Sequence, residues 1–452
     1  MQSMIEYLKS VLESKKVLIL GFGKEGRSTL EFLDKYLPEV DISIADANKD
    51  LKNDQLLSKY PESNLFFGDD YLNNLNRFDF IIKSPGVNLR NALISPNTEV
   101  SSQTSLFLDF YHNQVIGVTG TKGKSTTSSL IYFLLQKLNK KSVLLGNIGK
   151  PAFNSIKGID EDTIIVYELS AHQLESIKTS PKVAVLLNIF PEHLDYFTNF
   201  ESYANAKFNI IKFQTKDGST VINKKLITKD LINGKTLSFG LESNNNAFIE
   251  GEKIVFVKNG IRQSFNCNNL KIKGTHNWLN VMAAVLSLNE TGIAIDDILQ
   301  YLNKFKSLPH RLEFIGEFSG VKFYNDSIST VPESTIEAIK TLGKIDTLLL
   351  GGFDRGIDYS ILADYLMKTD VNNLIFMGKA GGRILNLLIT RGVDEKKINV
   401  ANNLEEAFLI IKSKAKIASI CLLSPAASSY DKFKNFEHRG DFFRGLAASF
   451  SR

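Results

Sequence analysis

The sequence predicts an α/β protein with three domains. Its 452 residues are enough for about three domains of roughly 150 residues each, and 43% of them are apolar, which is ample for packed cores. Two glycine-rich loops each follow an apolar strand-like run and precede a helical pattern, an order typical of parallel α/β sheets. The apolar periodicity lapses at "RNALISPNTEVSSQTS" and around "FKSLPHRLEF". We therefore expect domains at residues 1–103, 104–306 and 307–452.

Charge and composition argue against several classes of protein. The net charge is only +5 against 54 basic and 49 acidic side chains, and no run of five or six basic residues occurs, so no nucleic acid is expected as a partner. No apolar stretch approaches the roughly 18 residues that cross a bilayer, and the start "MQSMIEYLKSVLESKK" lacks the apolar core of a signal peptide. We expect a cytoplasmic protein that does not bind a membrane.

The first glycine-rich loop follows the strand-like run "KVLIL". Gly21, Gly23 and Gly26 form a G-x-G-x-x-G pattern, and Asp46 ends the next strand-like run 20 residues after Gly26. Such a loop lets backbone N–H groups at a helix N-terminus approach a diphosphate. A dinucleotide, another nucleotide and a tight turn without a ligand all fit this pattern. A second turn, at 84–86 in "IIKSPGV", is also suited to backbone contact with a ligand.

The second glycine-rich loop is "GVTGTKGKSTT", residues 117–127, which departs from the usual phosphate-loop pattern because Val118 stands where the first glycine is expected. Glycines leave room for phosphate oxygens, the lysine reaches the terminal phosphates, and the hydroxyl groups suit magnesium. We predict ATP-type nucleotide binding by Gly120, Thr121, Lys122, Gly123, Lys124, Ser125 and Thr126. The buried run "TIIVYELS" ends in Glu168, which is placed to hold magnesium.

A further segment, "LNIFPEHLDYFTNFESYANAK", presents His193 and Asp195 in a predicted loop and Lys207 on a predicted helix. A single histidine in such a position is usually structural, and a single helical lysine usually faces solvent. From these residues alone, neither side chain is predicted to act in catalysis.

The chain resembles the Mur ligases along all three predicted domains. The motifs that carry the resemblance occur in the family's order, and they are "GVTGTKGKSTT", "NIG", "ELSAHQLE", "LNIFPEHLDYF", "YANAK", "GTHNWLN", "LPHRLE", "YNDSISTVPES" and "SPAASSYDKFKNFEHRGDFF". The family uses a T-G-T/S-x-G-K-[ST] loop, which accounts for Val118. The resemblance implies a Rossmann-like first domain, a central ATPase-like phosphate-loop domain with a mainly parallel sheet, and a Rossmann-like third domain.

The resemblance also implies a reaction. The set is most similar to the branch that adds glutamate to UDP-N-acetylmuramoyl-L-alanine in peptidoglycan precursor synthesis, a process of cell wall biogenesis that supports cell shape and division. ATP phosphorylates the substrate carboxylate, and the amino group of glutamate attacks the acyl phosphate. Lys124 is implied to stabilise the phosphoryl group. Two magnesium ions are expected, one held by Ser125 and Glu168 and the other by His193 and by Lys207, which carbon dioxide converts to a carbamate. A monomer is expected.

The same resemblance implies three further groups of contacts. For the UDP substrate they are Gly21, Phe22, Gly23, Gly26, Asp46, Ser84, Gly86 and Asn147; for the nucleotide, Asn277, Asn280, His310, Arg311 and Asp326; and for glutamate, Arg355, Ser429 and Phe436. An oxidoreductase is disfavoured because hydride transfer has no use for a phosphate loop. A regulatory GTPase is disfavoured because the chain lacks an N-K-x-D motif.

One position departs from the pattern of many ligases that add D-glutamate. They read N-D-S-K-[AS]-T, whereas this chain reads "NDSIST", with Ile328 in place of the lysine. Either Arg355 or Lys432 is expected to replace the missing charge, or the preference for D-glutamate changes. We favour D-glutamate; L-glutamate and a different Mur-type amino-acid ligation stay open as alternatives.

Overall fold

The computed structural model describes residues 1–193, 196–227 and 233–451. Asp195 lies outside these residues. The chain forms two compact units, the first made of residues 1–270 and 275–305, and the second of residues 271–274 with the chain from residue 306 onward.

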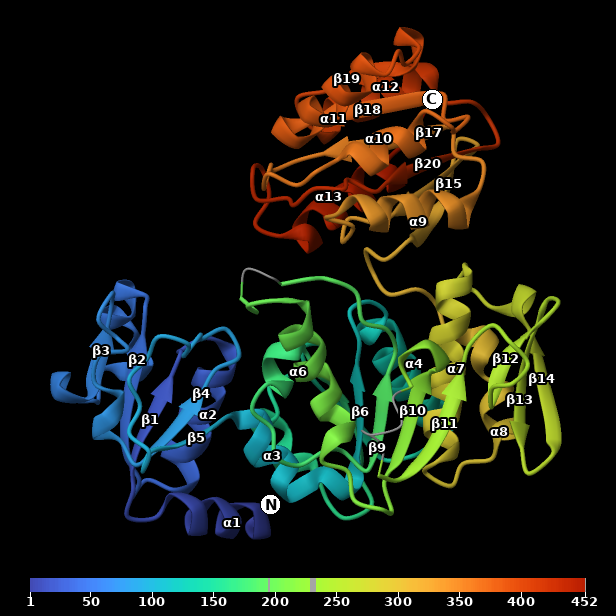
Figure 1. Ribbon diagram of the computed structural model, residues 1–452. Helices are drawn as coiled ribbons and strands as arrows, with labels where there is room; N and C mark the ends of the chain where they lie inside the picture. Colours follow the sequence, from blue (N-terminus) through green and yellow to red (C-terminus); the bar gives the residue numbers. More distant parts are fainter. Residues whose placement is uncertain (194–195, 228–232, 452) are drawn as a thin grey trace. The chain divides into compact units, whose positions relative to one another are not determined.

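A five-stranded parallel sheet forms the N-terminal part of the first unit, in the order β3-β2-β1-β4-β5 (Figure 1). Its strands are β1 (Lys16–Leu20), β2 (Asp41–Asp46), β3 (Leu65–Phe67), β4 (Phe80–Lys83) and β5 (Glu99–Ser101), and its helices are α1 (Gln2–Leu12), α2 (Lys24–Tyr36) and α3 (Gln103–Tyr111). The central strand β1 is buried from Val17 to Leu20, as expected of a strand covered on both faces. The order is that of a doubly wound, Rossmann-like sheet.

The rest of the first unit is built on a nine-stranded sheet in the order β14-β13-β12-β11-β10-β9-β6-β8-β7. Its strands are β6 (Val115–Thr119), β7 (Ser142–Gly146), β8 (Ile164–Glu168), β9 (Val183–Leu186), β10 (Ser219–Asn223), β11 (Lys235–Phe239), β12 (Ala247–Glu250), β13 (Lys253–Lys258) and β14 (Ile261–Asn266). Its helices are α4 (Lys124–Lys137), α5 (Ala171–Leu174), α6 (Phe200–Lys212), α7 (Thr275–Asn289) and α8 (Ile295–Leu299). Strands β8, β6 and β9 are parallel neighbours, so the loops at their carboxyl ends meet at one edge of the sheet.

The second unit contains a six-stranded sheet in the order β15-β16-β20-β17-β18-β19, in which only β15 is antiparallel to its neighbour. Its strands are β15 (Glu313–Phe318), β16 (Val321–Asn325), β17 (Thr347–Gly351), β18 (Asn373–Met377), β19 (Ile398–Val400) and β20 (Ser419–Leu423). Its helices are α9 (Pro332–Leu342), α10 (Ser360–Leu366), α11 (Gly378–Thr390), α12 (Leu404–Lys414) and α13 (Phe436–Ala448).

The predicted fold class is confirmed, because three mainly parallel sheets with accompanying helices make up the described chain. Each sheet lies within one of the three predicted domain ranges. The chain packs as two units, so the division into three domains near residues 103 and 306 stays a prediction. None of the described helices is both long enough and apolar enough to cross a membrane.

Candidate active site

The phosphate-binding loop joins strand β6 to helix α4. Gly120 and Gly123 have φ angles of 157° and 89°. A Cβ atom on Gly123 would lie 2.4 Å from the Oδ1 atom of Asn280, and one on Gly120 would lie 2.9 Å from Leu187. The close path of the loop therefore requires glycine at both positions. Val118, which the usual pattern would replace by glycine, is instead buried in strand β6.

Three lysines surround this loop. The Nζ atom of Lys124 donates to the carbonyl oxygen of Gly120 at 2.9 Å. The Nζ atom of Lys207, on helix α6, donates to the same oxygen at 2.9 Å. Lys122 forms an ion pair with Glu192, with its Nζ atom 2.7 Å from the Oε1 atom. The loop thus gathers three amino groups, two of them at a single carbonyl group, where a polyphosphate is expected to bind.

Lys207 is buried, with 1% of its surface exposed, although a helical lysine usually faces solvent. Asn199 fixes the start of its helix by accepting a hydrogen bond from the Ser202 N–H group at 2.8 Å. Burial, together with the nearby ammonium group of Lys124, lowers the pKa of Lys207 to about 6. The amine is therefore mostly uncharged at neutral pH, and it can act as a nucleophile.

Glu168 ends strand β8 and is fully buried. Its Oε1 atom accepts a hydrogen bond from the Nδ2 atom of Asn147 at 2.8 Å, while its Oε2 atom is buried without a hydrogen-bond partner among the described residues. Leaving a buried carboxylate oxygen unpaired is costly, and oxygen atoms of this kind are preferred ligands of magnesium. The side chain therefore fits the predicted role at a metal ion.

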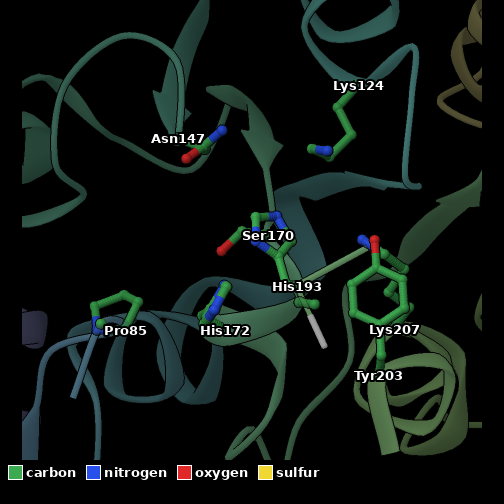
Figure 2. Close-up of a pocket in the computed structure, with 10 residues that line it drawn as sticks. Pro85, Lys124, Asn147, Ser170, His172, His193, Tyr203 and Lys207 are labelled. Carbon is green, nitrogen blue, oxygen red and sulfur yellow. The ribbon is translucent and has the colours of Figure 1, made fainter. Parts of the chain in front are cut away.

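A cavity of about 340 Å³ lies beside these residues. It is lined by Pro85, Gly86, Lys124, Asn147, Ser170, Ala171, His172, His193, Tyr203 and Lys207. Figure 2 shows the two lysines and the two histidines around this cavity, which they reach from separate segments of the chain. The structure thus brings together five residues that the sequence predicts to act in catalysis or in binding.

His172 and Tyr203 line the cavity but were not singled out from the sequence. The ring of His172 lies 5.1 Å from that of His193, centroid to centroid, and burial lowers the pKa of His172 to about 4. The hydroxyl group of Tyr203 lies 3.0 Å from that of Thr121 in the phosphate loop. His172 lies on helix α5, shortly after the strand end at Glu168, and its place in the motif "ELSAHQLE" is the signal that could have revealed it.

The first glycine-rich loop is held by its own neighbours. The Oδ2 atom of Asp46 accepts a hydrogen bond from the Phe22 N–H group at 2.6 Å, and the Ser84 hydroxyl group donates to the Gly21 carbonyl oxygen at 2.7 Å. A Cβ atom on Gly26 would lie 2.1 Å from that same carbonyl oxygen. These predicted UDP-binding residues therefore shape the loop, whereas Gly23 and Gly86 have open space beside their Cα atoms.

The buried lysine Lys83, in the five-stranded sheet, is hydrogen-bonded to residues that follow strands of the nine-stranded sheet. The Nζ atom of Lys83 lies 2.9 Å from the Val87 carbonyl oxygen, 3.4 Å from the Glu175 carboxylate and 3.3 Å from the Tyr196 hydroxyl group. That hydroxyl group also donates to Glu175 at 2.9 Å. The backbone carbonyl of Tyr196 accepts from Arg90 at 2.7 Å. These bonds tie the turn at 84–86 to the loop that carries His193, and sequence reasoning missed them.

The residues predicted to bind the nucleotide are divided between the two units. Asn280 adjoins Gly123 and donates to Asn277 at 3.1 Å in the first unit. His310, Arg311 and Asp326 belong to the second unit. Burial raises the pKa of Asp326 to about 6, and the carboxylate accepts hydrogen bonds from the Leu312 N–H group and from the Ser329 and Ser424 hydroxyl groups. Asp326 thus organises the turn that follows β16.

The predicted glutamate contacts gather at the carboxyl end of the second unit's sheet. Arg355 is exposed in the loop after β17, Ser429 is buried in the loop after β20, and Phe436 opens helix α13. Ile328 is half-buried in the turn after β16. Lys432, a candidate for the missing charge, is exposed, and its Nζ atom donates to the Asn402 carbonyl oxygen.

Two family descriptions match the sequence. The Mur ligase middle domain matches residues 118–288, and the N-terminal domain of MurD-like Mur ligases matches residues 15–102. A relative from Clostridium botulinum (strain Kyoto / Type A2), named UDP-N-acetylmuramoylalanine--D-glutamate ligase, is 32% identical over 99% of this chain and 99% of its own. The chain belongs to the Mur ligase family. A relative of the same name from Clostridium tetani (strain Massachusetts / E88) is 31% identical to this Mur ligase over 97% of each chain.

Solved structures share the fold of this Mur ligase. The UDP-N-acetylmuramate-alanine ligase MurC from Thermotoga maritima is 19% identical, with a TM-score of 0.60 over 96% of this chain and 99% of that one. The MurF ligase from Thermotoga maritima, crystallised in complex with ADP, is 18% identical, with a TM-score of 0.58 over 96% and 95%. The shared α/β fold therefore covers nearly the whole chain.

Proposed function

We propose that this Mur ligase uses ATP to join the amino group of D-glutamate to the alanyl carboxylate of UDP-N-acetylmuramoyl-L-alanine. The observation that carries the proposal is one cavity that collects Lys124 of the phosphate loop, the buried lysine Lys207, and Asn147, which is hydrogen-bonded to Glu168. The relatives that match nearly the whole chain carry the name of this enzyme.

The reaction divides into two transfers. An oxygen of the substrate carboxylate attacks the γ-phosphorus of ATP, ADP leaves, and an acyl phosphate forms. The amino group of glutamate then attacks the acyl carbon, phosphate leaves, and the nitrogen loses a proton. Both steps bring anionic groups together, so cations at the loop stabilise the transition states. Lys124 serves the transferring phosphoryl group.

The same residues fit two magnesium ions. When bound, magnesium offsets the repulsion between the phosphate groups and the incoming carboxylate. Ser125, in the first turn of α4, and the unpaired oxygen of Glu168 would hold one ion; His193 and a Lys207 carbamate would hold the other. The described residues contain no group of three or more His, Cys, Asp and Glu side chains able to hold a metal alone, so the set needs the hydroxyl group and the carbamate.

Carbon dioxide reacts only with an uncharged amine, and the lowered pKa of Lys207 supplies one. In ¹³C-labelled bicarbonate, the protein should show a carbamate signal in its NMR spectrum that Lys207→Ala removes. The matched control is Lys212→Ala, which alters an exposed lysine on the same helix. Lys207→Ala should also lose activity that short-chain carboxylic acids partly restore. Full activity of Lys207→Ala without any additive would refute the carbamate role.

We assign the remaining contacts as the family pattern places them. The first glycine-rich loop, Asp46 and the turn at 84–86 would receive the UDP group. Asn277 and Asn280 of the first unit are assigned to the nucleotide of ATP. The same assignment is made for His310, Arg311 and Asp326 of the second unit. Arg355, Ser429 and Phe436 would receive glutamate. The enzyme would act as a three-domain monomer in the cytoplasm, where peptidoglycan precursors for cell wall growth, cell shape and division are made.

The enantiomer of glutamate is the part of the proposal that Ile328 puts in question, and L-glutamate is the second candidate. Phosphate release should be measured with ATP, magnesium and UDP-N-acetylmuramoyl-L-alanine in the presence of each enantiomer. Release with D-glutamate alone is the expected result. Release only with L-glutamate would favour the second candidate, and no release with either would refute the ligase reaction.

A further inference from the structure

The sheet of the second unit has a topological switch point between β17 and β20. From β17 the chain continues to β18 and β19 on one side, whereas β20 is added on the other side. Ligands of open α/β sheets bind outside the carboxyl ends of the strands at such a point. The loops after the two strands meet there, because the Phe353 N–H group donates to the Ser428 carbonyl oxygen at 2.9 Å.

An arginine is buried among these loops. Arg439, on helix α13, has 3% of its surface exposed. Its Nε and Nη2 atoms donate to the hydroxyl and carbonyl oxygens of Ser327 at 3.0 and 2.8 Å. Its Nη atoms also donate to the carbonyl oxygens of Ala427 at 2.9 Å and Ser428 at 3.2 Å. One side chain thus connects the turn before Ile328 with the loop before Ser429.

All of these partners are uncharged. Within the described part of the chain, no carboxylate accepts a hydrogen bond from Arg439, and Asp431 acts on it only at a distance. Burial lowers the pKa of Arg439 to about 10, so the group still carries its positive charge at neutral pH. A buried cation without a hydrogen-bonded counter-ion is costly for a fold. An anionic ligand at this place would balance the charge.

A second, independent feature points to a ligand. The hydroxyl group of Ser428 is buried and lacks a hydrogen-bond partner among the described residues, and the residue is 4% exposed. The backbone of Gly352 packs closely against these residues. A Cβ atom on Gly352 would lie 2.4 Å from the Ser428 carbonyl oxygen and 3.1 Å from the Nη1 atom of Arg439. An unused hydroxyl donor beside an unbalanced cation suits a carboxylate group.

We propose that Arg439 is the positioning residue of the amino-acid site, where its charge and its hydrogen bonds to Ser327 and Ser428 set those loops to receive a carboxylate group of glutamate. The inference rests on the proposed ligase function and deepens it.

Steady-state kinetics of three variants test this inference. Arg439→Gln should raise KM for glutamate about 10- to 100-fold, the range expected for losing a charged hydrogen-bonding group, and leave KM for ATP unchanged. Arg439→Lys keeps the charge and should show a smaller increase. Adding Ile328→Lys to Arg439→Gln returns a cation one residue from Ser327 and should lower KM for glutamate again. A merely structural role would instead lower kcat and thermal stability, with no change in KM for glutamate.

If Arg439→Gln does not fold, the Ser428→Ala variant tests whether these loops receive a carboxylate group of glutamate. Its hydroxyl group has no hydrogen-bond partner to lose, so stability should not fall, whereas KM for glutamate should rise several-fold. An unchanged KM in Ser428→Ala, or in a folded Arg439→Gln, would overturn the inference while the unmodified enzyme stays active. An unmodified protein that releases no phosphate with either enantiomer would overturn the proposed function as well.

Discussion

Replacing Lys207 by methionine should stabilise the first unit at neutral pH. The side chain is buried, and its pKa falls from 10.5 to about 6 in the folded protein. Unfolding exposes the amine, which then takes up a proton at any pH below 10.5. The depressed pKa therefore lowers the free energy of unfolding. This loss has its full size below about pH 6 and disappears as the pH rises toward 10.5.

The size of the effect follows from these two pKa values. Between pH 7 and pH 9 the unfolded chain binds about one proton more than the folded chain at this site, and each pH unit is worth about 1.4 kcal/mol. The unmodified protein should therefore gain about 2.5 kcal/mol of unfolding free energy relative to Lys207→Met over this range. Methionine has a similar length and no ionisable group, so the difference isolates the charge.

Urea unfolding at pH 7 and pH 9 measures this difference. The chain has a single tryptophan, Trp278 on helix α7, and its fluorescence reports on the first unit. Buffers should contain a chelator and no bicarbonate, because a carbamate would remove the titrating amine. Lys212→Met, at an exposed position on the same helix, is the control and should track the unmodified protein. A stability difference between Lys207→Met and the unmodified protein that is equal at both pH values would refute the reasoning.

Three further predictions concern the phosphate loop and its metal. Lys124→Ala should lower kcat/KM for ATP about a thousandfold, since the phosphoryl group loses a cation, and an ADP-release assay that finds activity within tenfold would contradict this. Gly123→Ala should abolish ATP binding in calorimetry, because its Cβ atom would lie 2.4 Å from Asn280 at a φ of 89°; unaltered affinity would count against the loop's role. Glu168→Gln should keep or raise the melting temperature while raising the magnesium concentration for half-maximal rate about tenfold or more, and an unchanged magnesium requirement would argue against a metal at Glu168.

Much of the fold could be predicted because its signals are local. The apolar run before Gly120 and the helical pattern after Gly123 are read within about 20 residues, and both elements are present. The properties of Lys207 are different in kind. The sequence places it on an ordinary helix, and its depressed pKa arises only when the fold brings its Nζ atom to the carbonyl group of Gly120, 87 residues away.

The buried arginine of the second unit was equally hidden from the sequence. Arg355 and Lys432 were the candidates that the sequence offered for the missing charge, and both are exposed. Arg439 lies on helix α13, and an arginine on a helix normally faces solvent. Its burial against Ser327 depends on hydrogen bonds between residues 112 positions apart, which no local pattern encodes.

The contact of the buried Lys83 with Glu175 and Tyr196 has a consequence for evolution and for protein engineering. The three side chains are hydrogen-bonded to one another, and they come from different segments of the chain. Loss of Glu175 or of the Tyr196 hydroxyl group would leave the buried ammonium group of Lys83 with fewer partners, so the three positions should vary together among Mur ligases. A chimera that exchanges the first sheet between two relatives should fold well only when residues 83, 175 and 196 come from the same parent.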